Sequence, residues 1–211
     1  MKGRSRDGML ALGLGLFLAQ AAAGAGGASV QALQLGDAIL LATQKMQSVD
    51  GSRVSIADVR GEKGTLVVFT CNACPWAKAW EERIAALGNL YRGKGIGVIA
   101  INANDPARNA EDGYDVMQTR ARERGMRFPY VVDATSEMAR RFGATRTPEA
   151  FLFDSGGRLV YHGTIDDNAH DPGKVQKRYL RDALDAVVTG RPVPVPETKA
   201  LGCSIKFRPA S

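Results

Sequence analysis

The segment that decides the fold is Thr65–Tyr91, which reads TLVVFTCNACPWAKAWEERIAALGNLY. It begins with the apolar run Leu66–Phe69, whose length is typical of a fully buried strand in a parallel sheet. Farther along, apolar residues recur at the spacing of one helix face: Trp76, Trp80, Ile84 and Leu87. Pro75 suits the first turn of such a helix, where its missing N–H costs nothing. Two cysteines, Cys71 and Cys74, therefore lie where a buried strand turns into a helix.

The place of the cysteine pair indicates redox chemistry. Unpaired N–H groups and the positive end of the helix dipole would stabilise a thiolate at the first cysteine and lower its pKa from about 8.5. Cys71 is then the expected nucleophile, and Cys74, one helical turn on and more buried, is the expected resolving thiol. The C-x-x-C spacing lets both sulfurs pair with little backbone movement. The alternatives are a structural disulfide and half of a zinc site, although no second ligand pair lies at zinc spacing.

The N-terminus has the pattern of a secretory signal peptide. Basic residues open the chain, and the apolar stretch Met9–Ala19 that follows is too short to span a bilayer. Small residues come next, so we expect cleavage near Ala23 or Ala25 and assign residues 1–25 to the signal. The sequence thus predicts a periplasmic or secreted protein with no stable membrane anchor. An uncleaved N-terminal anchor is the alternative.

Composition describes the rest of the chain as one domain followed by a tail. The 211 residues carry a formal charge of +6, with bases and acids intermixed, so we expect a solvated surface and no nucleic-acid partner. Three cysteines are too few for a disulfide scaffold, and their odd number leaves one thiol over once Cys71 and Cys74 are paired. We assign residues 36–190 to the domain and residues 191–211, rich in proline, to an extended tail that carries Cys203.

The patterns along the chain predict an α/β fold, with a central mixed β-sheet flanked by helices. An N-terminal β-hairpin is expected in Lys45–Ser48 and Arg53–Ser55. A second buried strand, Gly95–Ile101, should run parallel to the first. Further elements are expected over these ranges: 112–124 (polar helix), 128–133 (extended), 136–142 (helix capped by Ser136), 144–154 with 158–162 (hairpin) and 174–190 (amphipathic helix).

The loop Asn102–Pro106 follows the second buried strand. Loops at the carboxyl ends of strands surround the ligand crevice of an open α/β sheet, so this loop and Cys71 should share one edge. Asp105 is a candidate to carry protons for the buried thiol, with Asn102 or Asn104 orienting it. The alternative is a polar turn that caps the next element.

These features together resemble the thioredoxin-like superfamily, and more narrowly its exported redoxins of the peroxiredoxin-like, or AhpC/TSA-like, branch. The resemblance covers about residues 36–207 and is carried by FTCNACPWAKAWEERI, INANDP, FPYVVD, GATRTPEAFLFD, LVYHGTIDD and TKALGCSIKF. It implies a thioredoxin-like fold in which Pro148 is cis and lies against the cysteine pair. Thr147 would then offer backbone hydrogen bonds to an extended substrate. Trp76 would supply an aromatic substrate surface, unless it packs in the core.

Two departures from the family patterns bear on the activity. Thioredoxins carry a buried acid six residues before the first cysteine, where this chain has Thr65, so another group must manage the proton of Cys74. Peroxiredoxins carry Pro-x-x-x-Thr-x-x-Cys. When Cys74 is laid on that cysteine, Val67 and Cys71 stand at the proline and threonine places.

The sequence therefore predicts a periplasmic thiol–disulfide oxidoreductase that uses the Cys71–Cys74 pair. Its expected partners are protein thiols or disulfides and an upstream redox donor or acceptor. A peroxiredoxin-like thiol peroxidase, with peroxide as substrate, is the first alternative. A thioredoxin-like module that binds copper or a partner is the second, although such copper sites use C-x-x-x-C spacing. No cofactor and no metal are expected.

Two features stay open. Cys203 is a third redox thiol that folds back to the site, a buried structural thiol, or half of an intermolecular disulfide. A group of potential metal ligands follows the second hairpin strand, and we interpret it as a solvated loop rather than a metal site: His162, Asp166, Asp167 and His170.

Overall fold

The computed structural model describes residues 32–209, so the expected signal peptide and its cleavage sites lie outside the described residues. The strands are β1 (Met46–Ser48), β2 (Arg53–Val54), β3 (Gly64–Phe69), β4 (Ile96–Asn102), β5 (Tyr130–Val132), β6 (Arg146–Thr147), β7 (Glu149–Asp154), β8 (Leu159–Gly163) and β9 (Cys203–Ser204). The helices are α1 (Pro75–Arg92), α2 (Tyr114–Glu123), α3 (Glu137–Phe142) and α4 (Tyr179–Val188), with short 3-10 turns η1 (Ala57–Val59), η2 (Ala110–Asp112) and η3 (Pro172–Lys174).

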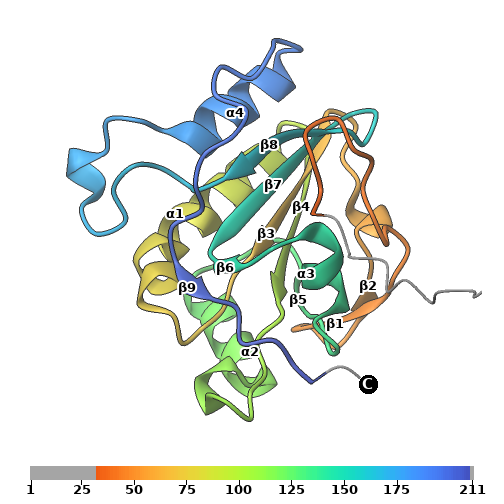
Figure 1. Cartoon of the computed structure of the whole chain (residues 1–211), viewed down its shortest axis with the longest axis vertical. Coiled ribbons are helices and arrows are strands. Elements are labelled where there is room, and N and C mark those ends of the chain that lie inside the picture. Colours follow the sequence, from red (N-terminus) through yellow and green to blue (C-terminus); the bar gives the residue numbers. More distant parts are fainter. Residues whose placement is uncertain (1–31, 210–211) are drawn as a thin grey trace, which may run out of the picture.

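Seven of the strands form one mixed sheet in the order β2-β1-β5-β4-β3-β7-β8, and β6 pairs with β9 in a separate two-stranded sheet. Figure 1 shows the large sheet between α3 on one face and α1 on the other. The predicted α/β fold, with a central mixed sheet flanked by helices, is confirmed. The N-terminal hairpin is also confirmed, because β1 pairs antiparallel with β2 and then joins β5.

The strand before the cysteines lies at the centre of this sheet. β3 runs parallel to β4 and antiparallel to β7, and all of its residues are buried. Its side chains alternate between two cores. Leu66 and Val68 pack with residues of α1, α2 and α4, whereas Val67 and Phe69 pack with residues of α3. A strand buried on both faces gives the site a rigid base.

The last helix is shorter than the sequence predicts. We expected a helix over 174–190, but α4 begins only at Tyr179. The preceding residues are tied instead to the loop after β8, because Gln176 N–H donates to the carboxylate of Asp167 and Asp167 N–H donates to the carbonyl of Lys177. These bonds hold the chain in an extended path that a helical periodicity cannot reveal.

The cap of α3 also differs from the prediction. Ser136 occupies the expected N-cap position, but its hydroxyl donates to the carbonyl of Ala103 at 2.7 Å and makes no cap bond. The carboxylate of Asp133 accepts instead from the N–H of Ala139 at 2.9 Å. The helix ends at Phe142, where its predicted range ends, and Gly143 follows at a φ of 73°.

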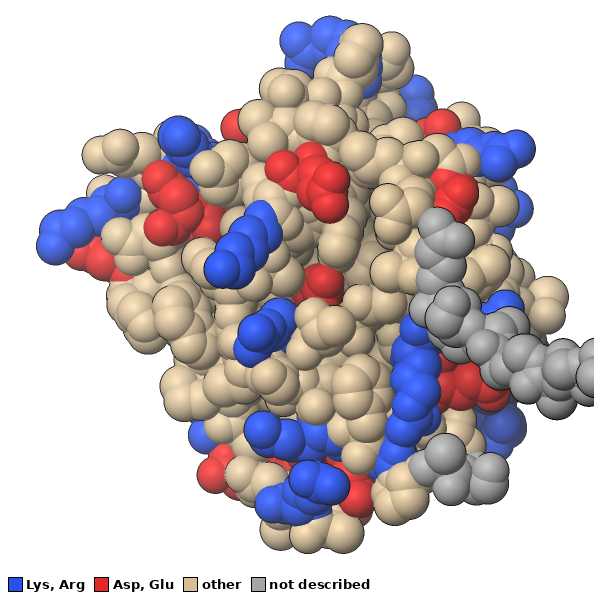
Figure 2. Space-filling view, viewed as in Figure 1, with Lys and Arg blue, Asp and Glu red and all other residues tan. Residues whose placement is uncertain are grey.

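The C-terminal tail is extended and packs along the domain. The carbonyl of Pro196 accepts from the N–H of His162, and the N–H of Thr198 donates back to the carbonyl of His162. Beyond this point β9 reaches β6, beside which it lies in Figure 1. On the face drawn in Figure 2, basic and acidic side chains are interspersed. No helix within residues 32–209 has the length and apolar character needed to cross a bilayer.

Candidate active site

The two cysteines of the C-x-x-C segment occupy different places relative to α1. The helix begins at Pro75, so Cys74 is its N-cap residue and Cys71 lies three residues earlier, in the turn after β3. The sulfur of Cys74 accepts a hydrogen bond from the N–H of Ala77 in the first turn. The prediction that Cys71 faces the helix N-terminus, with Cys74 one turn on, is therefore wrong. The sequence held the signal, because a proline at the first helical position makes the preceding residue the N-cap.

The pKa values of the two thiols shift in opposite directions. A hydrogen bond from the Cys71 thiol lowers the pKa of Cys74 most; bonds from the Cys203 thiol and the Ala77 N–H add to this against the opposing effect of burial. The pKa of Cys71 is raised by its bond to Cys74, then by burial and by the negative charge of Asp112. The helix dipole also favours an anion at Cys74. These directions favour the thiolate at Cys74 and the proton at Cys71, whereas the sequence led us to expect the nucleophile at Cys71.

Thr147 contacts both sulfurs from the opposite side. Cys71 Sγ lies 3.1 Å from Thr147 Oγ1, and Cys74 Sγ lies 3.1 Å from the carbonyl oxygen of Thr147. A protonated Cys74 donates to this carbonyl, which therefore opposes ionisation of Cys74. Donors to the Cys74 sulfur, namely the thiols of Cys71 and Cys203 and the N–H groups of Ala77 and Cys203, favour ionisation. The Thr147–Pro148 peptide bond is cis, as the resemblance implied. Thr147, the residue before the cis-proline, thus lies against the cysteine pair.

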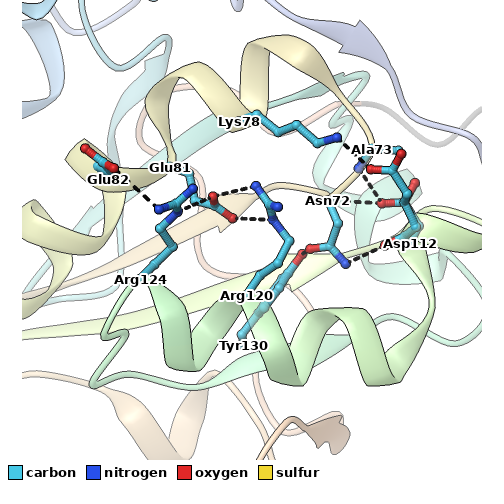
Figure 3. A network of polar contacts seen from close by, with 10 residues as sticks. Asn72, Ala73, Lys78, Glu81, Glu82, Asp112, Arg120, Arg124 and Tyr130 are labelled. Atoms are coloured by element: carbon cyan, nitrogen blue, oxygen red, sulfur yellow. Dashed lines mark hydrogen bonds and ion pairs between the residues drawn. The ribbon is translucent and has the colours of Figure 1, made fainter.

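A buried carboxylate that the sequence reasoning missed holds the cysteine turn. Asp112 Oδ1 accepts from the N–H groups of Asn72 and Ala73, at 2.7 and 3.1 Å. Figure 3 shows these contacts, together with the hydroxyl of Tyr130, which donates to Asn72 Oδ1 at 3.0 Å. Asp112 was expected only as the start of a polar helix, and nothing in its local sequence indicates burial.

The Asn102–Pro106 loop reaches the same edge of the sheet but plays a different part. Asn104 donates to Asp112 Oδ2 at 2.8 Å and accepts from the N–H of Lys206 at 2.9 Å. Asn102 donates to the carbonyl of Asp112 at 3.3 Å. The carboxylate of Asp105 accepts from the N–H of Ala107 at 3.0 Å and so caps its own turn, which was the alternative to a proton-carrying role. The carboxylate whose charge acts on Cys71 is Asp112.

A second buried carboxylate holds the cis-proline turn. Glu149 Oε2 accepts from the N–H groups of Thr145 and Arg146, at 2.8 and 2.9 Å. Glu149 Oε1 lies 2.6 Å from Nε2 of His162. The bonds to Thr145 and Arg146 fix the backbone just before Thr147. This role of Glu149 could not be predicted from the sequence, because a glutamate at the start of a strand is more often a solvent-exposed side chain.

The third cysteine also lies at the site. Cys71, Cys74 and Ala77 form a small buried cluster, and Trp76 and Cys203 pack against it. Cys203 belongs to β9, where it is the register partner of Thr147. All three cysteines are reduced. Of the alternatives for Cys203, the position beside the pair is the one observed.

The potential metal ligands in β8 and the loop after it are separated by their contacts. His162 pairs with Glu149, and Asp166 accepts from Trp80 Nε1 at 2.7 Å and from Arg83 at 2.5 Å. The ring of His170 lies 5.3 Å from that of Trp76. Within residues 32–209, no three His, Cys, Asp or Glu side chains are grouped to hold a metal ion.

Comparison with known proteins gives the family and the fold of this chain. A sequence model described as the AhpC/TSA family matches residues 36–162. The crystal structure of an uncharacterized conserved protein from Geobacillus kaustophilus is 36% identical, with a TM-score of 0.77 over 84% of this chain and 94% of that one. The solution structure of a thioredoxin-like protein in the oxidised form is 19% identical, with a TM-score of 0.58 over 75% and 99% of the two chains. This likeness shows the thioredoxin-like fold.

The curated relatives carry a named activity. The thiol-disulfide oxidoreductase ResA of Geobacillus thermodenitrificans is 26% identical over 125 residues, which make up 57% of this chain. The match spans 66% of the length of that relative. Its name describes exchange between thiols and disulfides, the chemistry that paired cysteines at a helix N-terminus can perform.

Proposed function

The chain belongs to the AhpC/TSA family, and we propose that it is a thiol–disulfide oxidoreductase whose redox pair is Cys71 and Cys74. One observation carries the proposal. Cys71 and Cys74, the N-cap residue of α1, lie in one buried cluster, and Thr147 of the cis-proline turn contacts both sulfurs. The name of the relative ResA supports the same reaction class.

Cys74 acts first in the proposed reaction. Its thiolate attacks one sulfur of a substrate disulfide, so a Cys74–substrate bond forms and the other substrate sulfur leaves as a thiolate that takes up a proton. Cys71 then attacks Cys74 Sγ, which forms the Cys71–Cys74 disulfide and releases the second substrate thiol. The substrate gains two electrons and the cysteine pair loses them. The reverse sequence would oxidise a substrate, and the midpoint potential of the pair decides the direction.

The environment of Cys71 favours this order of events. The largest cause of its raised pKa is its hydrogen bond to Cys74. That bond stabilises the protonated Cys71 only while Cys74 is an anion. Once Cys74 is joined to a substrate, the bond is weakened and the pKa of Cys71 falls. The resolving thiol is therefore activated at the step that needs it.

Protein thiols and disulfides are the proposed substrates, and an upstream redox protein is the proposed donor or acceptor. The signal-peptide pattern of residues 1–25 supports a periplasmic or secreted location. Such a compartment lets disulfides persist. Thr147 and Pro148 would form the substrate edge, with Trp76 beside it.

A redox titration of the protein in glutathione and dithiothreitol buffers tests the proposal. Each cysteine is read by differential alkylation and mass spectrometry. We expect Cys71 and Cys74 to change together as one two-electron couple, and reduction of insulin to fail in Cys74→Ser. If the two never pair, and hydrogen peroxide instead converts Cys74 rapidly to a sulfenic acid, the oxidoreductase proposal is wrong and the peroxidase alternative replaces it.

A further inference from the structure

The tail covers the cysteine pair. Cys71 and Cys74 are each only 4% exposed, and the half-buried Cys203 packs directly against them. A disulfide of another protein cannot reach Cys74 Sγ while that contact is in place. Either the tail leaves before every reaction, or the tail takes part in the chemistry.

The tail is seated as an added strand. Cys203 is the register partner of Thr147, and Ser204 is the register partner of Arg146, in an antiparallel pair. The N–H of Ile205 donates to the carbonyl of Thr145 at 3.0 Å and continues the ladder. Addition of an extended segment to a free strand edge is a general mode of peptide recognition. β9 therefore binds β6 as a peptide substrate would.

The residues on either side of Cys203 fit this position closely. A Cβ atom on Gly202 would lie 2.2 Å from the carbonyl oxygen of Thr147, so only glycine permits the approach. Beyond Cys203, the side chain of Ile205 is buried in the core that contains α3. The carbonyl of Lys206 accepts from the N–H of Asp105 at 2.7 Å. The tail is thus held before and after its cysteine.

The sulfur of Cys203 is placed to react with Cys74. Its thiol hydrogen-bonds the Cys74 sulfur. Burial, then this bond and the negative charge of Cys74, raise the pKa of Cys203 to about 11. The last two causes disappear when Cys74 enters a disulfide. Cys203 thus becomes easier to ionise in the oxidised protein.

We propose that β9 is an internal substrate strand and that Cys203 is a third redox cysteine, which exchanges disulfide with Cys74. This inference rests on the proposed function, because it starts from the Cys71–Cys74 disulfide. The Cys203 thiolate attacks Cys74 Sγ, the Cys74–Cys203 bond forms, and the Cys71–Cys74 bond breaks. Cys71 leaves as a thiolate and takes up the proton that Cys203 lost. One disulfide replaces another, so no electrons enter or leave the chain.

The first test traps the tail disulfide in the Cys71→Ser variant, which has no resolving thiol in the pair. The variant is treated with oxidised glutathione, quenched by alkylation and mapped by mass spectrometry. We expect an intramolecular Cys74–Cys203 disulfide and release of reduced glutathione. The proposal is overturned if Cys74 remains joined to glutathione while Cys203 stays a free thiol.

The second test disrupts the pairing of β9 with β6 and keeps both Cys74 and Cys203. In the Cys71→Ser background, Gly202→Ala should slow formation of the Cys74–Cys203 bond by roughly ten-fold or more, because docking sets the effective concentration of the two thiols. Gly93→Ala is the matched control, since a Cβ there meets only the carbonyl of Leu90, at 3.4 Å. Equal rates in the two variants would show that the strand pairing does not deliver Cys203.

A third variant separates this inference from the proposed function. Cys203→Ser should still form the Cys71–Cys74 disulfide in the redox titration. If it does, and the trap nevertheless fails, only the role of Cys203 is wrong. If neither the parent nor Cys203→Ser forms the Cys71–Cys74 disulfide, the proposed function falls, and the inference falls with it.

Discussion

Cys71 and Cys74 are separated by two residues, yet they differ in charge because one of them caps a helix. Cys74 accepts bonds from a helix N–H and from two thiols, whereas Cys71 lies behind it near the carboxylate of Asp112. Folding lowers the pKa of Cys74, so its ionisation stabilises the reduced protein above the unfolded thiol pKa of about 8.5. That contribution shrinks as the pH falls toward the folded pKa.

The first prediction concerns the pH profile of alkylation. We expect Cys74 to react with iodoacetamide with a midpoint well below that of an ordinary thiol, about 8.5, and Cys71 with a midpoint above it. Cys71→Ala should move the midpoint of Cys74 upward, because the Cys71 hydrogen bond is the largest cause of the lowered pKa. Cys71→Ser is the matched control, since its hydroxyl can still donate. Identical Cys74 midpoints in all three proteins would contradict the explanation.

The second prediction concerns Asp112→Asn. The asparagine side chain has no negative charge. Its NH₂ group would also face one of the groups that now donate to Asp112, either the N–H of Asn72 or the side-chain amide of Asn104. We expect the pKa of Cys71 to fall, but only partly toward its ordinary value, because Asp112 is one of several causes of the raised pKa. We also expect a loss of about 1–3 kcal/mol in the free energy of unfolding. The measurements are the alkylation profile of Cys71 and urea denaturation.

The control for Asp112→Asn is Glu111→Gln, at the exposed neighbour that pairs with Lys78. A surface pair of this kind contributes about 0–1 kcal/mol, so this variant should unfold almost as the parent does. Similar effects of the two substitutions on Cys71 would mean that the buried carboxylate has no special influence.

The sequence predicts those helices and strands that have a clear apolar periodicity and are bounded by glycine, proline or other turn residues. The buried run of β3, the amphipathic face of α1 and the β7–β8 hairpin appear where they were expected. The burial of Asp112 and Glu149 could not be predicted, because their partners are backbone N–H groups far away or in a turn of unknown shape. The predicted start of α4 is wrong for a similar reason, because hydrogen bonds to Asp167 hold the residues before Tyr179 out of the helix.

The third prediction concerns the cis-proline turn. Glu149→Ala removes the acceptor for two backbone N–H groups and the partner of His162. We expect a loss of about 3 kcal/mol in the free energy of unfolding, because buried groups are left without partners. Insulin reduction should also slow, since Thr147 loses its support.

Urea denaturation measures this loss, with Glu62→Ala as the control. Glu62 is exposed, so its removal should change stability by about 0.5 kcal/mol or less. A Glu149→Ala variant as stable as the control would show that the turn is held by other contacts.

The C-terminal tail connects the last helix to the cysteine pair. It continues from the last helix along the edge of β8, then brings β9 to β6 and buries Ile205 in the core of the opposite face. The sequence left three uses for Cys203 open, because a two-residue strand has no periodicity to read. Only the folded chain brings a residue more than a hundred positions away next to Cys74.

The last prediction concerns a chain that ends at Lys199, which keeps the bonds of residues 196 and 198 to β8 but lacks β9. Loss of Ile205 burial should lower the free energy of unfolding by about 2 kcal/mol, so the domain should still fold. Cys74 should react with iodoacetamide roughly ten-fold faster or more at pH 7, because reactivity of a thiolate follows its exposure. A chain ending at Arg208 retains β9 and should react as the parent does. Equal rates in the two shortened chains would show that something other than the tail limits access to Cys74, since both keep the same helix N-terminus and the same neighbouring Cys71.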